Sequence, residues 1–263
     1  MRKLLLSLVF LYLACAPFRG SPYSEVLITG ERDLNTKKLP DLNAIETDAV
    51  VRIGVVTDSH QNYRDFRTVV EQLNGMSGID FVVHLGDFTN SAYNFEYDQF
   101  IELWNRLLLP KFCVQGNHDA IGAGSTLYEK AFGDANTYFE SGNYRFISFM
   151  TNNWEDPNDF SPQWLLDRVQ ETTKAVIIFS HVPLMDTERY SGNDRAILDQ
   201  VLQQPNVILS LNGHNHTYIA NKVGNVVIIQ GARVEGENWL TVDITATTIS
   251  VLNSKGEASS WPR

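Results

Sequence analysis

Cysteine is nearly absent from this sequence of 263 residues, which contains only Cys15 and Cys113. Two cysteines cannot supply a disulfide framework, so an ordinary apolar core has to hold the fold. Cys113 lies inside an apolar run and is predicted to be a small buried residue. Repeats and low-complexity segments are absent as well, which excludes repeat arrays and disordered proteins.

Positive charge is also scarce, because 21 Lys and Arg residues stand against 31 Asp and Glu and the formal net charge is -10. Proteins that follow the nucleic-acid backbone are rich in positive charge, so this balance argues against nucleic acid as a partner. It does not exclude a small phosphorylated substrate, since bound metal ions can reverse the sign of the local field.

The N-terminal apolar stretch, Leu4–Ala14, is too short to span a membrane. It follows Arg2 and Lys3, and a basic start before a short apolar run is typical of a secretory signal peptide. We therefore expect residues 1–14 to be a signal peptide and the protein to be exported to the periplasm or the outer surface.

Two cleavage sites compete at the end of this segment. Residues 11–15 read Leu-Tyr-Leu-Ala-Cys and resemble a bacterial lipoprotein box, which predicts a lipid anchor on Cys15 as the protein's contact with a membrane. Tyr12 departs from the pattern, which usually has Leu there. The alternative is a small-residue site over residues 14–16, although Pro17 would then be a poor first residue.

The rest of the chain predicts one α/β domain over residues 49–253, preceded by a tether and irregular lead-in over 15–48 and followed by a tail over 254–263. Short β-branched runs alternate with segments of helical periodicity. Strands are predicted at 50–57, 80–85, 111–115, 174–180 and 206–211, helices at 63–74, 95–109, 161–171 and 194–203, and a hairpin at 138–150.

Five strand-like runs end in side chains that bind metals, and five of the six histidines lie at these ends. Any one such histidine would be unremarkable, but a single shared site explains all of them, because ligands bind at the carboxyl ends of strands in open α/β sheets. His84 lies inside an apolar run and is predicted to be a buried partner rather than a ligand. The ends carry Asp58 and His60, Asp87, Asn117 and His118, His181, and His214 and His216.

The donor types predict the kind of metal. Imidazole, carboxylate and amide without thiolate suit Mn, Fe or Zn and exclude a Cys-rich structural zinc site. The side chains are too many for one ion with an open position. Two divalent ions about 3.5–4 Å apart that share one carboxylate are the usual arrangement for phosphate ester hydrolysis.

Five motifs in this order resemble the calcineurin-like metallophosphoesterase superfamily: Asp58-x-His60, Gly86-Asp87, Gly116-Asn117-His118-Asp119, His181 and Gly213-His214-x-His216. The resemblance covers residues 49–253. It implies a four-layer α/β/β/α sandwich with two mixed β-sheets and a dinuclear metal site at the carboxyl edge of the strands.

The resemblance also implies a role for each residue. His118 would be the catalytic imidazole that assists the leaving group, and Asp119 would orient it. Two sets of ligands would be joined by a bridging carboxylate: Asp58, His60 and His216 at one ion, Asn117, His181 and His214 at the other, and Asp87 between them.

Two differences from the motifs of other branches indicate which branch of the superfamily this chain resembles. Purple acid phosphatases have Gly in place of the first-motif histidine and a tyrosine after the Gly-Asp pair, whereas this chain has His60 and Phe88. Protein phosphatases usually carry Arg just after that pair, which is also missing here. The sequence therefore resembles the compact bacterial phosphodiesterases and phosphomonoesterases.

The predicted function is hydrolysis of small phosphate mono- or diesters by in-line attack of a metal-activated hydroxide. The alternatives are a non-catalytic metal-binding or protein-interaction module on the same fold, whose members typically lose ligands, and a nuclease, against which the acidic charge argues. Arg189 lies in a polar loop that could contact a substrate phosphate or be simply solvated. Stacking of a nucleobase on Trp154 or Trp239 has no support in the sequence.

Overall fold

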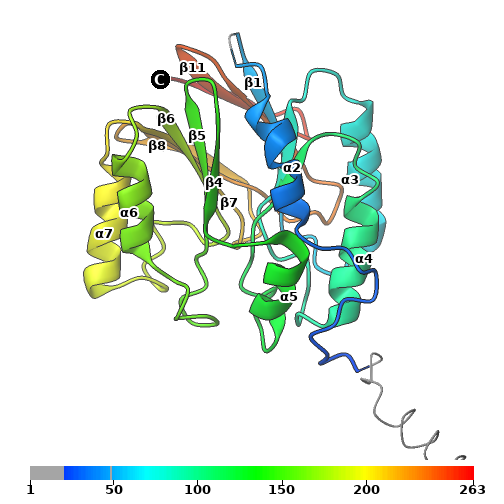
Figure 1. Cartoon of the computed structure of the whole chain (residues 1–263). Coiled ribbons are helices and arrows are strands. Elements are labelled where there is room, and N and C mark those ends of the chain that lie inside the picture. The colour runs from blue at the N-terminus through cyan, green and yellow to red at the C-terminus, as the bar shows by residue number, and fades with distance from the viewer. Residues whose placement is uncertain (1–20, 48) are drawn as a thin grey trace, which may run out of the picture.

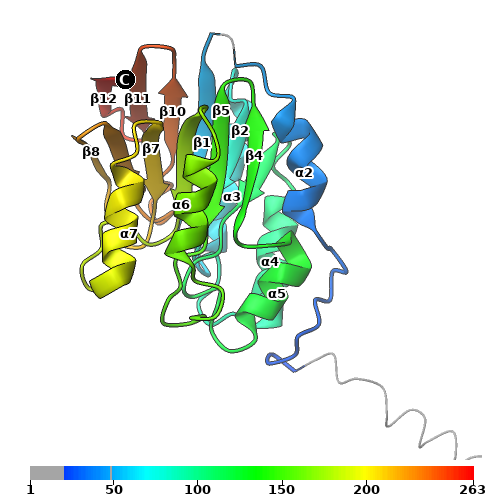
Figure 2. The same ribbon diagram turned by 60° about the vertical axis from the view of Figure 1, so that its left-hand side comes forward.

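The computed structural model describes residues 21–47 and 49–263, and these form two β-sheets packed face to face (Figures 1 and 2). In the first sheet β1, β2 and β3 are parallel, and β10, β11 and β12 extend it in antiparallel fashion. Its order is β12 (Ala258–Pro262), β11 (Thr248–Asn253), β10 (Leu240–Ile244), β1 (Val51–Val56), β2 (Phe81–His84) and β3 (Lys111–Cys113).

The second sheet is also mixed. Four parallel strands, β5, β6, β7 and β9, form its centre, and antiparallel β4 and β8 form its two edges. The predicted hairpin is confirmed as β4 and β5. The order is β4 (Thr137–Ser141), β5 (Tyr144–Phe149), β6 (Ala175–Ser180), β7 (Val207–Asn212), β9 (Val226–Gln230) and β8 (Ile219–Val223).

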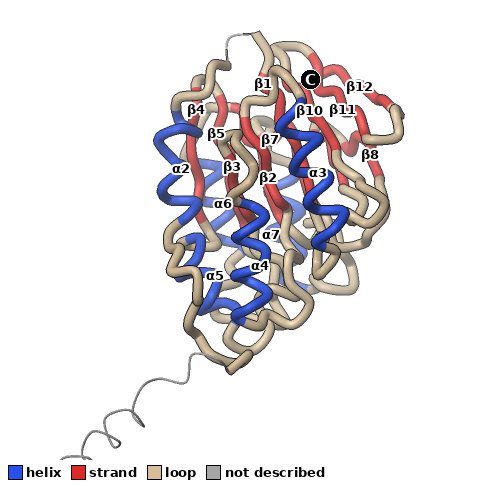
Figure 3. Tube along the Cα trace, turned by 90° about the vertical axis from the view of Figure 1, so that its right-hand side faces the viewer, coloured by secondary structure: helices blue, strands red, loops and turns tan. Residues whose placement is uncertain are grey.

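Helices cover the outer faces of both sheets and complete the four layers that the resemblance implied. On the first sheet, apolar faces of α3 (Tyr63–Gly75), α4 (Asn94–Trp104) and α5 (Gly124–Phe132) share one core with β1 and β2, and α3 and α4 lie across this sheet in Figure 3. On the second sheet, the apolar faces of α6 (Pro162–Gln170) and α7 (Gly192–Leu202) share a separate core with the strands. The predicted four-layer sandwich is confirmed.

Both predicted ends of the domain differ from the structure. The lead-in expected to be irregular contains α2 (Leu34–Asn43), although Pro40 lies within it. The buried side chain of Asn35 explains the difference, because it donates to the carbonyl of Cys113 at 2.8 Å and accepts from its N–H at 2.9 Å. Tertiary contacts thus override a weak helix signal. The expected C-terminal tail contains β12, which pairs with β11.

The predicted signal peptide and Cys15 lie outside the described residues. Over residues 21–47 and 49–263, no helix combines the length and apolarity needed to cross a membrane.

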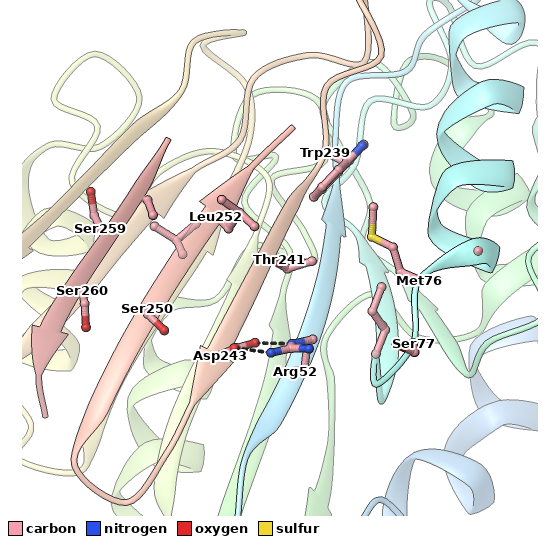
Figure 4. Close-up of a pocket in the computed structure, with 14 residues that line it drawn as sticks. Arg52, Met76, Ser77, Trp239, Thr241, Asp243, Ser250, Leu252, Ser259 and Ser260 are labelled. Carbon is pink, nitrogen blue, oxygen red and sulfur yellow. Dashed lines mark hydrogen bonds and ion pairs between the residues drawn. The ribbon is translucent and has the colours of Figure 1, made fainter. Parts of the chain in front are cut away.

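The outer face of β10 and β11 carries a shallow hollow of about 730 Å³ beside the end of α3 (Figure 4). Arg52 and Asp243 form a bidentate ion pair on its floor, with both N–O distances at 2.7 Å, and Trp239 lies at one end. None of the predicted metal ligands lines this hollow. The candidate site is instead at the carboxyl edge of the parallel strands.

Candidate metal centre

The backbone at this edge is strained where the predicted ligands lie. Non-glycine residues rarely adopt a positive φ, and such residues gather at functional sites, where the surrounding structure has to hold them in place. Five of the seven predicted ligands have this backbone: Asp58 (φ 51°), His60 (φ 46°), Asp87 (φ 55°), His214 (φ 75°) and His216 (φ 58°).

Two glycines let the loops approach one another. A Cβ on Gly116 would overlap the backbone nitrogen and the carboxylate of Asp87, and one on Gly213 would overlap Thr57 and lie 2.6 Å from Asp58. The motif glycines therefore bring the ligand loops together, since only a residue without a Cβ fits at these contacts.

One candidate metal-binding group consists of Asp58, His60 and His216, each of which offers a ligand atom within 4.8 Å of the others. The two imidazole Nε2 atoms lie 3.4 Å apart, and His216 Nε2 lies 3.4 Å from Asp58 Oδ1. Asp58 is buried and follows β1, whereas His216 comes from the loop after β7, so the site joins both sheets.

The other candidate group consists of Asp87, His181 and His214, again with ligand atoms within 4.8 Å of one another. Nε2 of His181 lies 3.1 Å from Asp87 Oδ2. Asn117 comes from the loop after β3, and its buried Oδ1 has no hydrogen-bond partner among the described residues.

Buried polar atoms that lack a hydrogen-bond partner indicate whether these residues suit cations. A buried polar atom without a partner costs free energy, so such atoms are rare unless an ion or water completes them. Here Asn117 Oδ1 makes no hydrogen bond with any described residue. Asp58 Oδ1 and His181 Nε2 also lack a well-formed hydrogen bond, and their polar neighbours are the other predicted ligands His216 and Asp87. The donor set and the unpartnered Asn117 oxygen fit divalent metal ions.

Hydrogen bonds behind the ligands fix their orientation. The carbonyl of Leu85 accepts a hydrogen bond from His181 Nδ1 at 2.8 Å, and that of Thr89 accepts one from His60 Nδ1 at 3.0 Å. A carbonyl can only accept, so Nδ1 carries the proton and the Nε2 lone pair faces the site. This arrangement is usual for histidines that bind metals.

The charges at the site favour the forms that bind metals. Burial alone would raise the pKa of Asp87, but His181 and the other nearby imidazoles lower it below its ordinary value. Burial lowers the pKa of His214 to about 4, which keeps it neutral. Burial also disfavours the protonated form of His181, but the adjacent Asp87 carboxylate outweighs burial and raises the pKa of His181 to about 9. A metal ion would therefore have to displace a proton from the His181 ring.

His118 lies beside the first group rather than within it. Its ring centre is 5.1 Å from that of His60, its backbone N–H donates to Asp87 Oδ1 at 2.8 Å, and its Nδ1 lies 2.7 Å from the carbonyl oxygen of Asn90. The half-buried imidazole therefore has its Nε2 free to exchange a proton with a ligand.

Asp119, which the resemblance implies as the partner that orients His118, makes its hydrogen bonds to the loop backbone and not to the ring. Its fully buried carboxylate accepts from the backbone N–H groups of Asp87, Thr89 and Gly116 at 2.8–2.9 Å, while Asn90 takes the place beside the His118 ring. Burial and the charge of Asp87 raise the pKa of Asp119 to about 7. Asp119 holds the ligand loops together and does not contact the imidazole through a hydrogen bond.

Sequence reasoning missed Glu96, a fully buried residue of α4. Its carboxylate accepts from the backbone N–H groups of Asn90 at 3.2 Å, Ser91 at 3.1 Å and Tyr93 at 2.9 Å, and from Gln61 Nε2 at 2.5 Å. Glu96 thus fixes the loop whose carbonyl holds His118. An acid three residues after a cap residue is the available signal, but the cap here is Tyr93 rather than Ser or Thr.

His84 behaves as predicted. It is fully buried, its Nε2 lies 3.0 Å from Ser59 Oγ, and burial lowers its pKa to about 3. The ring packs edge-on against Phe66 and Phe100, and His84 is a member of neither candidate group.

The sequence pattern of the calcineurin-like phosphoesterase family matches residues 51–218. None of the curated proteins searched matches the chain.

Several solved structures share the fold. A dimetal phosphatase from Danio rerio has a TM-score of 0.65 at 14% identity, with 81% of this chain and 99% of that chain covered. A purple acid phosphatase from yellow lupin (Lupinus luteus) has a TM-score of 0.63 at 12% identity and is covered over 54% of its length by 82% of this chain. GAP50 of Plasmodium, described as the anchor in the inner membrane complex, has a TM-score of 0.58 at 12% identity, with 82% of this chain and 89% of that chain covered.

Proposed function

Because this chain belongs to the calcineurin-like phosphoesterase family, we propose that it hydrolyses small phosphate mono- or diesters with two metal ions. The observation that carries the proposal is the pair of adjoining ligand groups with the His118 ring beside them. The acidic net charge of -10 favours a small ester over a nucleic acid as the substrate.

The ligand roles in this proposal follow the two groups. Two divalent ions, Mn, Fe or Zn, would acidify a water and neutralise the phosphoryl oxygens when bound. Asp87, which is grouped with His181 and His214, would be the shared ligand. The other ligands would be Asp58, His60 and His216 for one ion and Asn117, His181 and His214 for the second.

In the proposed mechanism His118 handles the proton of the leaving group. Cleavage of the P–O bond leaves an alkoxide, which is a poor leaving group unless it is protonated as the bond breaks. An imidazole held through Nδ1, with Nε2 free and beside the metal ligands, can donate that proton. Asn90, Glu96 and Asp119 keep the ring and the loops in place.

We also propose that the protein is exported and held at a membrane by a lipid on Cys15, with residues 1–14 removed. The support is the basic start and the short apolar run that ends in Leu-Ala-Cys.

The test begins with removal of metals by a chelator and reloading with Mn. We expect the reloaded protein to hydrolyse nitrophenyl phosphate mono- or diesters and to bind about two ions per chain by elemental analysis. A His118→Ala variant should keep both ions and lose roughly 100-fold or more in turnover. Two bound ions without turnover of any ester under any metal would favour the non-catalytic module instead.

A further inference from the structure

Trp154 is an exposed aromatic ring at the edge of the sheets that carries the candidate metal groups. It lies on the loop that joins the carboxyl end of β5 to the start of α6. All five tryptophans lie in the described part of the chain, and Trp154 is the exposed one, with 58% of its surface accessible.

Arg189 supports one face of this ring. Its guanidinium carbon lies 4.2 Å from the ring centre, in a cation–π contact. The guanidinium is itself fixed by Glu155, whose two carboxylate oxygens accept from it at 2.8–3.1 Å, and the Arg189 side chain is only 6% exposed. The indole is thus held on one side by a buried ion pair, while the ring remains accessible to solvent.

Hydrogen bonds fasten the Trp154 loop to the neighbours of two predicted metal ligands. Asn152 is fully buried, and its Nδ2 donates at 3.1 Å to the carbonyl of Gly116, the residue before Asn117. Thr151 Oγ1 accepts at 3.0 Å from the N–H of Val182, the residue after His181. The start of the loop that carries Trp154 is therefore fastened next to both predicted ligands.

Arg189 also joins the ring to a second loop at this edge. It lies on the loop between β6 and α7, which begins with His181, and its guanidinium lies against the face of the indole. The Asn153 side chain donates to the carbonyl of Arg189 at 2.7 Å and joins the two loops. The loop that begins with His181 and the loop that carries Trp154 are thus joined by side-chain contacts.

We propose that Trp154 is a stacking platform for the alcohol part of the substrate, and that this enzyme prefers phosphate esters whose alcohol carries a flat aromatic ring, as nucleosides and aryl alcohols do. This inference rests on the proposed hydrolase function. A pre-ordered indole stacks on any aromatic ring with little loss of conformational entropy, whereas an aliphatic alcohol gains nothing from it.

The test compares esters that differ only in the alcohol: adenosine 5′-phosphate and glycerol phosphate, each as the monoester and as its methyl diester. Trp154→Leu should lower kcat/KM for the adenosine esters roughly tenfold, mainly through KM, and leave the glycerol esters within about twofold. Trp154→Phe should restore most of the loss, because an aromatic face is retained.

Trp164 provides a matched control, since it also has an arginine over its ring, with Arg168 6.0 Å from the ring centre, but lies on α6. Trp164→Leu should change both alcohol classes equally or not at all. The proposal is overturned if Trp154→Leu affects adenosine and glycerol esters alike, or affects neither.

A binding measurement separates failure of this inference from failure of the hydrolase proposal. If the metal-loaded protein hydrolyses neither these esters nor the nitrophenyl phosphate esters under any metal, the proposed function is wrong. Quenching of tryptophan fluorescence by adenosine 5′-phosphate, lost in Trp154→Leu and kept in Trp164→Leu, would still support the platform. No quenching in the wild type, or the same quenching in Trp154→Leu, would overturn it.

Discussion

At the scale of single residues, the site depends on backbone conformations that most side chains avoid. Predicted ligands such as Asp87 and His214 have a positive φ, and Gly116 allows the loop of Asn117 to pass directly over Asp87. This strain is retained because buried hydrogen bonds hold it, above all those to Asp119.

Gly116→Ala should therefore destabilise the protein by about 1–3 kcal/mol, because the added methyl overlaps the backbone of Asp87. Metal content should fall as the two loops separate. Gly75→Ala is the control: nothing lies within 4 Å of its Cβ, and alanine in a helix is favoured by roughly 0.5–1 kcal/mol. Urea unfolding and elemental analysis measure both effects; equal stability of the two variants would contradict the close approach.

At the scale of elements, helix α4 reaches the site through its first turn. Glu96 receives the N–H groups of the loop that precedes the helix, and the same loop presents its Asn90 carbonyl to His118. The helix thus positions the imidazole from behind, without contributing a side chain to the metal groups.

Glu96→Gln should lower kcat roughly 10- to 100-fold with little change in metal content. An amide nitrogen would face N–H groups that need an acceptor, so the loop and with it His118 would shift. Glu102→Gln on the same helix is the control, since Glu102 is 68% exposed and pairs only with Arg106 on the surface. Steady-state kinetics of the two variants test this prediction. It is contradicted if Glu96→Gln keeps the wild-type kcat as Glu102→Gln does.

At the scale of the whole molecule, stability depends on contacts between the layers. Lys111 on β3 is buried under the end of α4, where its Nζ donates to the carbonyls of Trp104 at 2.5 Å and Leu107 at 2.9 Å. Burial lowers the pKa of Lys111 from 10.5 to about 8. Between these two values the unfolded chain holds the proton and the folded protein releases it.

The free energy of unfolding should therefore rise with pH in this window through Lys111, by up to about 1.4 kcal/mol per pH unit. The measurement is the difference between wild type and Lys111→Met in urea unfolding at pH 7, 8, 9 and 10, which cancels the other titrating groups. The wild type should gain stability relative to the variant above pH 8. A difference that stays flat or falls would contradict the lowered pKa.

Much of the architecture was predictable because short local sequence patterns determine where the strands and helices lie. Continuous β-branched runs marked the buried parallel strands, and the Ser161-Pro162 pair marked the start of α6, where Ser161 accepts from the Trp164 N–H. The pattern failed at α2 and β12, whose sequences have weak local signals. Contact with the distant residue Cys113 orders α2, and antiparallel pairing with the preceding strand β11 orders β12.

By itself, the sequence determined the family and placed metal-binding side chains at the ends of the strands, because motif residues and strand patterns are local. Only the tertiary structure decided what lies behind and beside those side chains: Asp119 bonds to loop backbones, Glu96 fixes the Asn90 loop, and Arg189 supports Trp154. The contacts of Asp119 and Arg189 join segments about 30 residues or more apart, which no local pattern specifies, whereas Glu96 bonds to its own preceding loop without the usual Ser or Thr cap that would have marked it.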